Sequence, residues 1–315
     1  MQNETNVPHS ESEVLNGAAP LDYLGIIKIE GEDAAKFIHG QLTHDFSLLG
    51  LEQARLAALC SPKGRMLASF IGYKDAQGNI FLICHKDLIA TTMKRLSMFV
   101  LRAKARLSDV TASFKLYGLA GDAIISASAE ASTPWSKMHP SDAVVINLYP
   151  VLGVPRQLWI GSLSATPPNG TSLLQNIWLW SEVRSGVATI CSAVADMLVP
   201  QMLNYESVGG INFKKGCYPG QEVVARSQFR GTIKRRAFVV HSAAELKIGD
   251  LVYGATDAEQ ECATVVQAAA APGGGFDAII SGQLAAIEQG QLHLASANGA
   301  DVTLLNLGYK LLEDI

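Results

Sequence analysis

The chain has 315 residues, of which 48% are hydrophobic and 17% charged, and its formal net charge is −4. This length exceeds what one compact core usually serves, so two or three domains are expected, and the ordinary globular composition argues against global disorder. The small net negative charge excludes a general attraction to nucleic acid or to an anionic membrane, so any site for a polyanion has to be local.

The cysteines are few and widely spaced, without any CxxC pair: Cys60, Cys84, Cys191, Cys217 and Cys262. This spacing predicts no zinc or cluster site, and the odd number favours reduced thiols in a cytoplasmic protein over a disulfide scaffold. No run approaches the roughly 20 apolar residues that a membrane helix needs. The polar stretch 1–20 predicts a disordered tail, neither signal peptide nor membrane anchor. We therefore expect a cytoplasmic protein that does not bind membranes.

Residues 21–112 predict a first α+β domain. The expected elements are a strand at 26–29, a helix beginning at the N-cap Asp33, strands at 54–60 and 65–73, a strand at 80–84, a helix at 88–99 and a strand at 103–110. The turn that contains Pro62 and Gly64 should join the second and third strands as a hairpin. Apart from one additional hairpin strand, this order approximates the split β-α-β arrangement of ferredoxin-like folds.

Two further domains are predicted beyond residue 112. Residues 113–235 should form a second α+β domain, with strands at 144–148 and 158–160 and a helix that follows Thr171-Ser172 and contains Trp178. From residue 236 to 315 the sequence pattern changes to short apolar segments separated by turn residues. Such a pattern is typical of a small antiparallel barrel. The predicted fold class is therefore α+β with a C-terminal β-barrel.

A glycine-rich stretch from residue 209 to 226 contains the cysteine with the most unusual surroundings. Cys217 follows Lys214 and Lys215 and comes just before Pro219-Gly220, where a short helix should begin. Cations and a helix N-terminus both stabilise a thiolate, so Cys217 is the candidate functional thiol. The alternative is a small buried residue, which is the usual role of an unpaired cysteine.

The segment Lys215-Gly216-Cys217-Tyr218-Pro219-Gly220-Gln221-Glu222 resembles the signature K-G-C-Y-x-G-Q-E of the YgfZ family. The stretches 40–45 and 62–65 and the flanks of the motif are similar as well, so the resemblance covers nearly everything from residue 21 onward. It implies ferredoxin-like α/β portions and a C-terminal barrel around a folate site, similar to the glycine-cleavage aminomethyltransferases. It also implies that the protein binds tetrahydrofolate or a related folate. Its expected partners are iron-sulfur enzymes such as tRNA methylthiotransferases, whose assembly or repair it would support, with an indirect effect on tRNA modification.

Two aromatic positions are implied by this resemblance as folate contacts, Tyr23 and Trp178. Aromatic faces suit a flat pterin ring. Taken alone, a tryptophan on a helix is more often part of the core.

The related transferases offer an alternative function, a folate-dependent one-carbon enzyme. They carry two adjacent aspartates where this chain has Ala68 and Ser69, neither of which supplies a carboxylate for catalysis. They also place a folate-contacting acid two residues before the glycine that matches Gly186, and Arg184 stands there instead. Aminomethyl transfer is therefore not expected, and no other chemistry follows from the sequence.

Positive charge is concentrated between residues 214 and 236. The anion-binding candidates are Lys214, Arg226, Arg230, Lys234, Arg235 and Arg236, together with Lys215 of the motif, against the single acid Glu222. Such a cluster could hold phosphates, the glutamate tail of a folate or an acidic protein, or form a solvated face. Direct RNA binding is the third hypothesis. RNA-binding surfaces usually place several aromatic residues among their basic ones, and here Phe229 is the single aromatic residue between 226 and 236.

Overall fold

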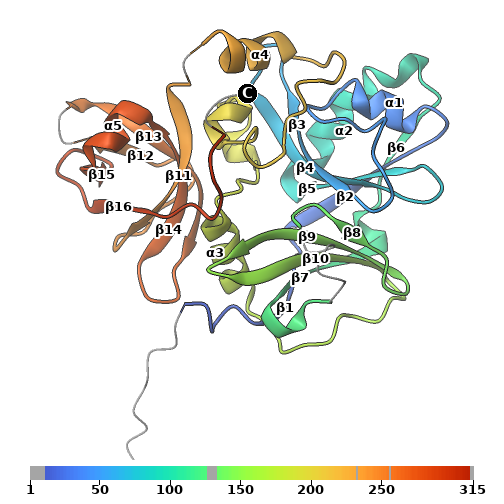
Figure 1. The fold of residues 1–315 in the computed structure, drawn as a ribbon, viewed down its shortest axis with the longest axis horizontal. Helices are drawn as coiled ribbons and strands as arrows, with labels where there is room; N and C mark the ends of the chain where they lie inside the picture. The colour runs from blue at the N-terminus through green and yellow to red at the C-terminus, as the bar shows by residue number, and fades with distance from the viewer. Residues whose placement is uncertain (1–10, 126–132, 232, 255–256, 313–315) are drawn as a thin grey trace, which may run out of the picture.

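The structure, a computed structural model, describes residues 11–125, 133–231, 233–254 and 257–312. Two five-stranded sheets and a closed barrel lie around a common centre (Figure 1). This architecture confirms the α+β class and the C-terminal antiparallel barrel. No helix in the described part of the chain is long and apolar enough to cross a membrane.

The first sheet has the strand order β3-β4-β5-β2-β6, and neighbouring strands are antiparallel. Its elements are β2 (Leu24–Glu30), α1 (Ala34–His39), β3 (Ala54–Cys60), β4 (Met66–Lys74), β5 (Ile80–His85), α2 (Ile89–Ser97) and β6 (Arg106–Asp109). The predicted hairpin is present: Gly64 N–H donates to Ser61 O at 2.8 Å and closes the turn between β3 and β4. Asp33 is the N-cap residue of α1, as predicted, but its carboxylate accepts the Lys104 amide hydrogen and makes no capping bond to the helix.

The second sheet has the order β1-β7-β10-β9-β8. Its strands are β1 (Gly17–Pro20), β7 (Phe114–Ala120), β8 (Lys137–Met138), β9 (Ala143–Val151) and β10 (Val154–Ser162). Strand β1 pairs with β7 and buries Ala19 completely. The predicted disordered tail is therefore wrong for Gly17–Pro20, while residues 1–10 lie outside the described residues.

Helix α3 (Gln175–Ser185) connects the second sheet to the barrel, because it contacts β9 on one side and β13 and β14 on the other. Its buried residues include Trp178, Trp180 and Val183. It is followed by η6 (Ser192–Val194), η7 (Pro200–Leu203) and α4 (Gln221–Phe229), and the other short 3-10 helices are η1 (Lys86–Leu88), η2 (Val100–Arg102), η3 (Thr111–Ser113) and η4 (Gly121–Ala123). In Figure 1, α3 lies between β14 and the second sheet.

The barrel closes in the order β11-β14-β13-β12-β15-β16. Its elements are β11 (Arg235–Ser242), β12 (Leu251–Gly254), β13 (Asp257–Ala270), β14 (Phe276–Gln283), α5 (Leu284–Gln289), β15 (Leu292–Leu294) and β16 (Asp301–Leu305). Residues from the first sheet, the loops after α3 and the barrel share one apolar core, which includes Phe70, Val208 and Val239. The first sheet, the loops after α3 and the barrel are therefore packed against one another.

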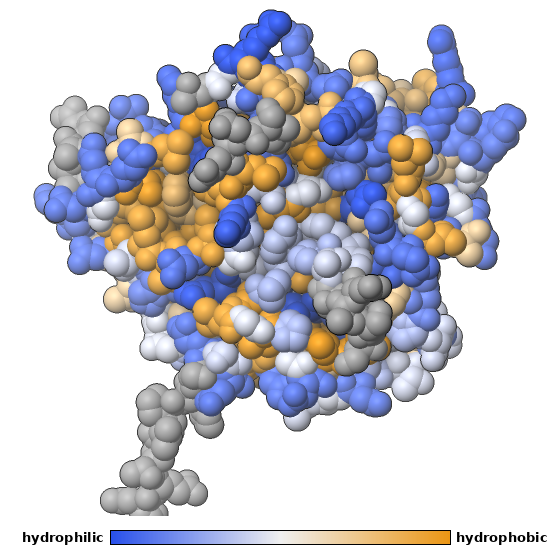
Figure 2. Space-filling model, in the orientation of Figure 1, coloured by the Kyte–Doolittle hydropathy of each residue, from blue (hydrophilic) through white to orange (hydrophobic). Residues whose placement is uncertain are grey.

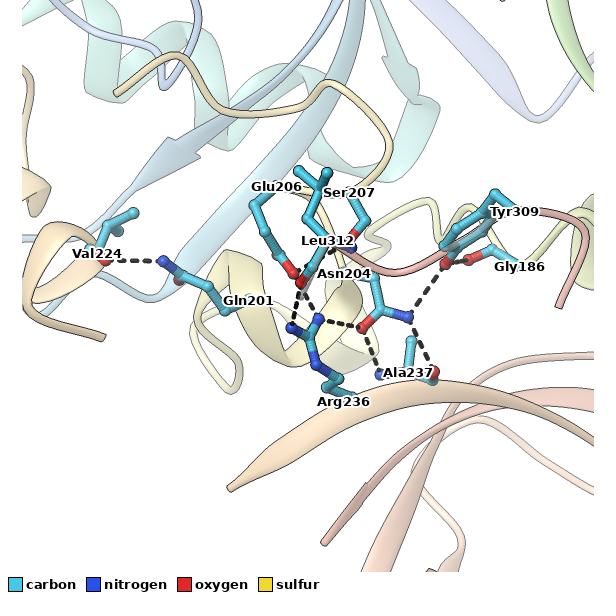
Figure 3. Close-up of polar contacts among 10 residues, drawn as sticks. All are labelled: Gly186, Gln201, Asn204, Glu206, Ser207, Val224, Arg236, Ala237, Tyr309 and Leu312. Atoms are coloured by element: carbon cyan, nitrogen blue, oxygen red, sulfur yellow. Dashed lines mark hydrogen bonds and ion pairs between the residues drawn. The ribbon is translucent and has the colours of Figure 1, made fainter. Parts of the chain in front are cut away.

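A buried polar network lies between the barrel and the segments after α3 (Figure 3). Arg236 on β11 forms an ion pair with Glu206, whose side chain is 0% exposed. Asn204, which is also fully buried, accepts the Ala237 amide hydrogen and donates to Ala237 O. The chain beyond β16 returns to this network, where Arg236 donates to Leu312 O and Tyr309 donates to Gly186 O. These bonds hold the segment 306–312 across the boundary between the barrel and α3.

Candidate functional site

The segment that carries the K-G-C-Y-x-G-Q-E motif packs on the loop that follows α1. The Lys215 ammonium donates to the carbonyl oxygens of His39 and Leu42, the latter at 2.8 Å. Thr43 donates to Gly210 O at 2.6 Å and accepts the Ala58 amide hydrogen at 2.9 Å. Burial lowers the pKa of Lys215 to about 8. Lys215 is therefore a structural cation that fixes the motif to the first domain.

A glycine pair fixes the motif to the hairpin between β3 and β4. Gly64 and Gly220 have φ angles of +73° and +80°, in the left-handed region that favours glycine. A Cβ at Gly220 would lie 2.4 Å from Ser61 O and 2.7 Å from Gly64 Cα. A Cβ at Gly64 would lie 2.8 Å from Val223 Cβ. The two backbones meet because neither residue has a side chain, and α4 starts directly after this contact.

Cys217 is exposed at this loop, whereas the other four cysteines, all within the described residues, are buried. Burial raises the pKa of Cys60 and of Cys84 to about 12, which keeps both as thiols. The structure thus separates one accessible thiol from four inaccessible ones. Within the described residues, no group of three or more His, Cys, Asp or Glu side chains could hold a metal ion.

The predicted basic cluster is divided by the structure. Lys214, Arg226, Arg230 and Lys234, which come before, within and after α4 in the chain, are exposed. Helix α4 lies at the top of Figure 1. Arg226 forms an exposed ion pair with Glu222 at 2.8 Å. Arg235 donates to Ser281 O, and Arg236 is buried against Glu206. Arg236 is therefore committed to the polar network, and the accessible cations are those around α4.

A central cavity lies between the two sheets and α3. Together with the solvent-open space at its mouth it measures about 590 Å³, and its wall is mostly apolar. The lining residues come from β2, β3, β4, β5, β9, β10 and α3, from the segment 187–189 that follows α3 and from Trp135; they include Leu24, Phe70, Ile83, Tyr149 and Val187. In Figure 2, the centre of the visible face, between the barrel and the two sheets, has intermediate hydropathy.

Two charged side chains, Glu182 and Arg156, line this cavity. Neither was identified from the sequence. Burial raises the pKa of Glu182, against the opposing effect of Arg156, and it lowers the pKa of Arg156 to about 10. No hydrogen bond or ion pair joins the two described side chains directly, and Arg156 Nε is buried without a partner. Glu182 Oε2 accepts from Gln267 Nε2, and Arg156 donates to Tyr149 O, both at 3.4 Å. Because these two bonds are long, the carboxylate and the guanidinium can still bind a ligand.

Tyr23 and Trp178 lie behind Glu182 and do not form the cavity wall. The Tyr23 hydroxyl and the Trp178 indole N–H both donate to Glu182 Oε1, at 2.7 and 3.3 Å. Trp178 is 0% exposed. The Arg156 guanidinium lies over its ring, 4.4 Å from the centroid. A Cβ at Gly118 would come within 2.4 Å of the same ring. The position of Trp178 therefore differs from the predicted stacking contact, since no ring face is accessible; both aromatic residues orient Glu182.

The structure agrees with the sequence that Ala68 and Ser69 supply no carboxylate, but it provides an acid near Gly186 that the sequence comparison had not identified. Ser69 lines the cavity and accepts the Ile190 amide hydrogen at 2.8 Å, and Ala68 is fully buried, so neither position supplies a carboxylate. Arg184 points to the barrel and pairs with Asp277 at 3.3 Å. Glu182, two residues earlier, faces the cavity instead. An acid for a ligand is therefore present, although the catalytic aspartates are not.

Glu182 had a weak signal in the sequence. It is the single acid in the helical stretch 174–185, in which Trp178, Trp180 and Val183 are buried. A charge in such a segment is often functional, because burying it without a partner is costly. Arg156 had no comparable signal, since it is the third residue of a β-strand, β10, that follows a turn.

No protein-family model matches the chain. A tRNA-modifying protein YgfZ of Hamiltonella defensa is 31% identical over 229 residues, which cover 68% of this chain and 66%, just under two thirds, of that protein. The tRNA-modifying protein YgfZ of Edwardsiella ictaluri is 30% identical, with 70% of this chain and 69% of that protein covered. The fold is similar to the crystal structure of glycine cleavage system aminomethyltransferase T from Bartonella henselae, with a TM-score of 0.68 and 12% identity over 96% of this chain and 90% of that one.

Proposed function

The chain belongs to the YgfZ family, and from that premise we propose that it binds a tetrahydrofolate, with the pterin in the central cavity, and has a folate-related role in tRNA modification. The role is indirect: the protein supports the assembly or repair of iron-sulfur enzymes, among them those that modify tRNA. Two relatives named as tRNA-modifying proteins and the aminomethyltransferase-like fold support this proposal.

The observation that carries the proposal is that Glu182 and Arg156 both line the cavity without forming an ion pair with each other, and that Arg156 Nε has no partner. A pterin presents a ring N–H and an amino group on one edge, which match the two oxygens of a carboxylate. Its carbonyl oxygen lies on the adjacent edge and can accept from a guanidinium. Charge-assisted hydrogen bonds of this kind are among the strongest in proteins and give a planar ligand one orientation. The apolar remainder of the wall suits the ring faces.

We propose that the exposed thiol of Cys217 is the group that acts on iron-sulfur enzymes. Cys217 lies on a loop that Lys215 and the Gly64–Gly220 contact hold in place. Its accessibility allows contact with a client protein or its cluster. Aminomethyl transfer is disfavoured, because Ala68 and Ser69 provide no carboxylate to stabilise charge or move a proton.

Calorimetric titration with tetrahydrofolate tests the cavity assignment. We expect the unaltered protein to bind and Glu182→Gln to bind at least about tenfold more weakly, because an amide offers a donor where the pterin also donates. Arg184→Gln is the matched control, since Arg184 lies on the same helix but points to Asp277. Thermal unfolding of both ligand-free variants checks that the fold is retained. Equal affinity of Glu182→Gln and the unaltered protein would reject the site.

A further inference from the structure

Trp135 lies between the central cavity and a second, polar groove. It is the one described residue that lines both. Together with the open solvent above it, this groove measures about 1160 Å³. Its other walls come from the start of β3, from β8 and from Gly209, which precedes the motif. The two spaces are thus adjacent and separated by an indole ring.

The backbone of Trp135 is strained and firmly held. Its φ angle is +69°, a left-handed conformation that side-chain-bearing residues rarely adopt. Trp135 O accepts from Ala54 N–H and Trp135 N–H donates to Asn147 O, both at 2.8 Å, and the indole N–H donates to Val208 O at 2.8 Å. Such strain persists only where the surroundings determine the position, and it is concentrated at ligand sites.

The groove carries groups that suit an anion. Arg55 and Lys137 supply two positive charges against the one carboxylate of Glu52. Arg55 Nε is buried without a partner. Lys137 is only 3% exposed, and its ammonium makes a 2.7 Å hydrogen bond to Lys74 O, which leaves two of its hydrogens for other acceptors.

His44 adds a neutral donor to the same groove. Burial lowers its pKa to about 4, so the imidazole is uncharged at neutral pH. Its Nδ1 accepts the Asp45 amide hydrogen at 2.7 Å, which places the ring proton on Nε2. His44 thus adds an uncharged donor to the two cations of this groove, Arg55 and Lys137.

The cavity has a second neighbour on its other side, reached past Leu24, which lines both the cavity and a groove near β7. That groove is lined by Lys86 and Lys115 but also by Asp22 and Asp109. Its charges balance, so it offers an anion no net attraction. The exposed cations around α4 line neither the cavity nor the groove beside Trp135.

We propose that the groove beside Trp135 binds the glutamate tail of a folate, with the aminobenzoyl ring against the Trp135 indole and the tail carboxylates at Arg55 and Lys137. The inference rests on the proposed pterin site and extends it. It moves the expected tail site from the basic cluster at α4 to Arg55 and Lys137, because these cations line the groove that shares Trp135 with the cavity.

The test compares three probes: 6-methyltetrahydropterin, which has no tail, tetrahydrofolate, and tetrahydrofolate with three glutamates. The unaltered protein should bind the triglutamate more tightly than the monoglutamate. Arg55→Gln and Arg55→Gln/Lys137→Met should lower the affinity for the triglutamate by roughly tenfold, the loss expected for a charge-assisted hydrogen bond, and leave the affinity for the tailless pterin unchanged. Because Lys137 is buried, the single Arg55 variant provides the result if the double variant fails to fold.

Two control variants test the other places where the glutamate tail could bind, at α4 and in the groove near β7. Arg226→Gln/Arg230→Gln removes exposed charge at α4, and Lys86→Met/Lys115→Met removes it at the opposite groove. Both should retain the preference for the triglutamate. Loss of that preference in either control, with Arg55→Gln unaffected, would overturn the tail site. If the unaltered protein binds all three probes equally, the tail site is rejected and the pterin site stands. Absence of binding by all three would overturn both.

Discussion

The Tyr23 hydroxyl donates a 2.7 Å hydrogen bond to Glu182 Oε1, across 159 positions of the chain. It connects the turn before β2 in the first sheet to helix α3. Burial raises the pKa of Glu182, and the hydrogen bonds from Tyr23 and Trp178 act in the opposite direction. The protonation of the cavity carboxylate therefore depends on a residue from another part of the fold.

The exchange Tyr23→Phe should weaken folate binding and make it more sensitive to acid. The variant keeps the ring but loses the bond to the carboxylate, so the pKa of Glu182 should rise further. Since the ionised form accepts the pterin hydrogens, affinity should fall as the pH drops, with a midpoint at higher pH in the variant. Calorimetry over about pH 5 to 8 measures this. Tyr253→Phe, in the barrel, should match the unaltered protein, and identical profiles for both variants would contradict the role of Tyr23.

Trp178→Ala should destabilise the protein without ligand. Its ring is completely buried, so truncation should lower the free energy of unfolding by about 3–5 kcal/mol. Gly118→Ala should also destabilise, because the new methyl group collides with the ring, whereas Gly254→Ala meets nothing within 4 Å. Chemical denaturation of the ligand-free proteins measures these differences in the free energy of unfolding. Unchanged stability together with lost folate affinity would favour the stacking role that the sequence suggested.

Cys217→Ser should separate folate binding from support of iron-sulfur enzymes. The replaced group is small and exposed, so the fold and the folate affinity should be nearly unchanged. The activity of an iron-sulfur enzyme such as a tRNA methylthiotransferase should nevertheless fail in a strain that lacks its own homologue. Full complementation by the serine variant would exclude a reactive thiol.

Alkylation of the native protein gives an independent measure of the same thiol. Iodoacetamide should modify Cys217 first, because the other four cysteines are buried. Mass spectrometry of the digested protein identifies the modified residue. Early modification of Cys60, whose pKa burial raises to about 12, would show that the fold opens in solution.

Glu206→Gln should strongly destabilise the protein. It leaves the Arg236 guanidinium buried without a countercharge, which typically costs about 3–5 kcal/mol. Glu222→Gln removes the partner of Arg226 on the surface and should change the stability by less than about 1 kcal/mol. Thermal unfolding distinguishes the two. A small effect of Glu206→Gln would mean that water reaches the network drawn in Figure 3.

Local patterns were sufficient to predict much of the fold. Apolar runs and the Pro62–Gly64 turn gave β3 at its observed bounds and β4 within one residue. Strand β1 was missed because Gly17–Pro20 consists of residues that do not favour strands. Its strand conformation comes from pairing with β7, a contact about 100 positions away.

The candidate site was predictable in its motif but not in its cavity. The motif is local, and the structure brings Lys215 and Gly220 against the first domain. The choice between Glu182 and Arg184 depends on the rotation of α3, on which they lie about 200° apart. That rotation is set by the barrel, where Trp180 donates to Asp277 at 2.8 Å. Counting back from Gly186 along the chain therefore could not identify the acid.

The contact between Gly64 and Gly220 limits how the sequence can vary. At most contacts a larger residue on one side can be accommodated by a smaller one on the other. Here each partner already has the smallest side chain, and each adopts a backbone conformation that opposes replacement. No second substitution at the partner position can rescue a first one. In a library of variants, every amino acid other than glycine should be depleted at both positions. Neutral substitutions can accumulate at neighbouring positions, but not at Gly64 or Gly220.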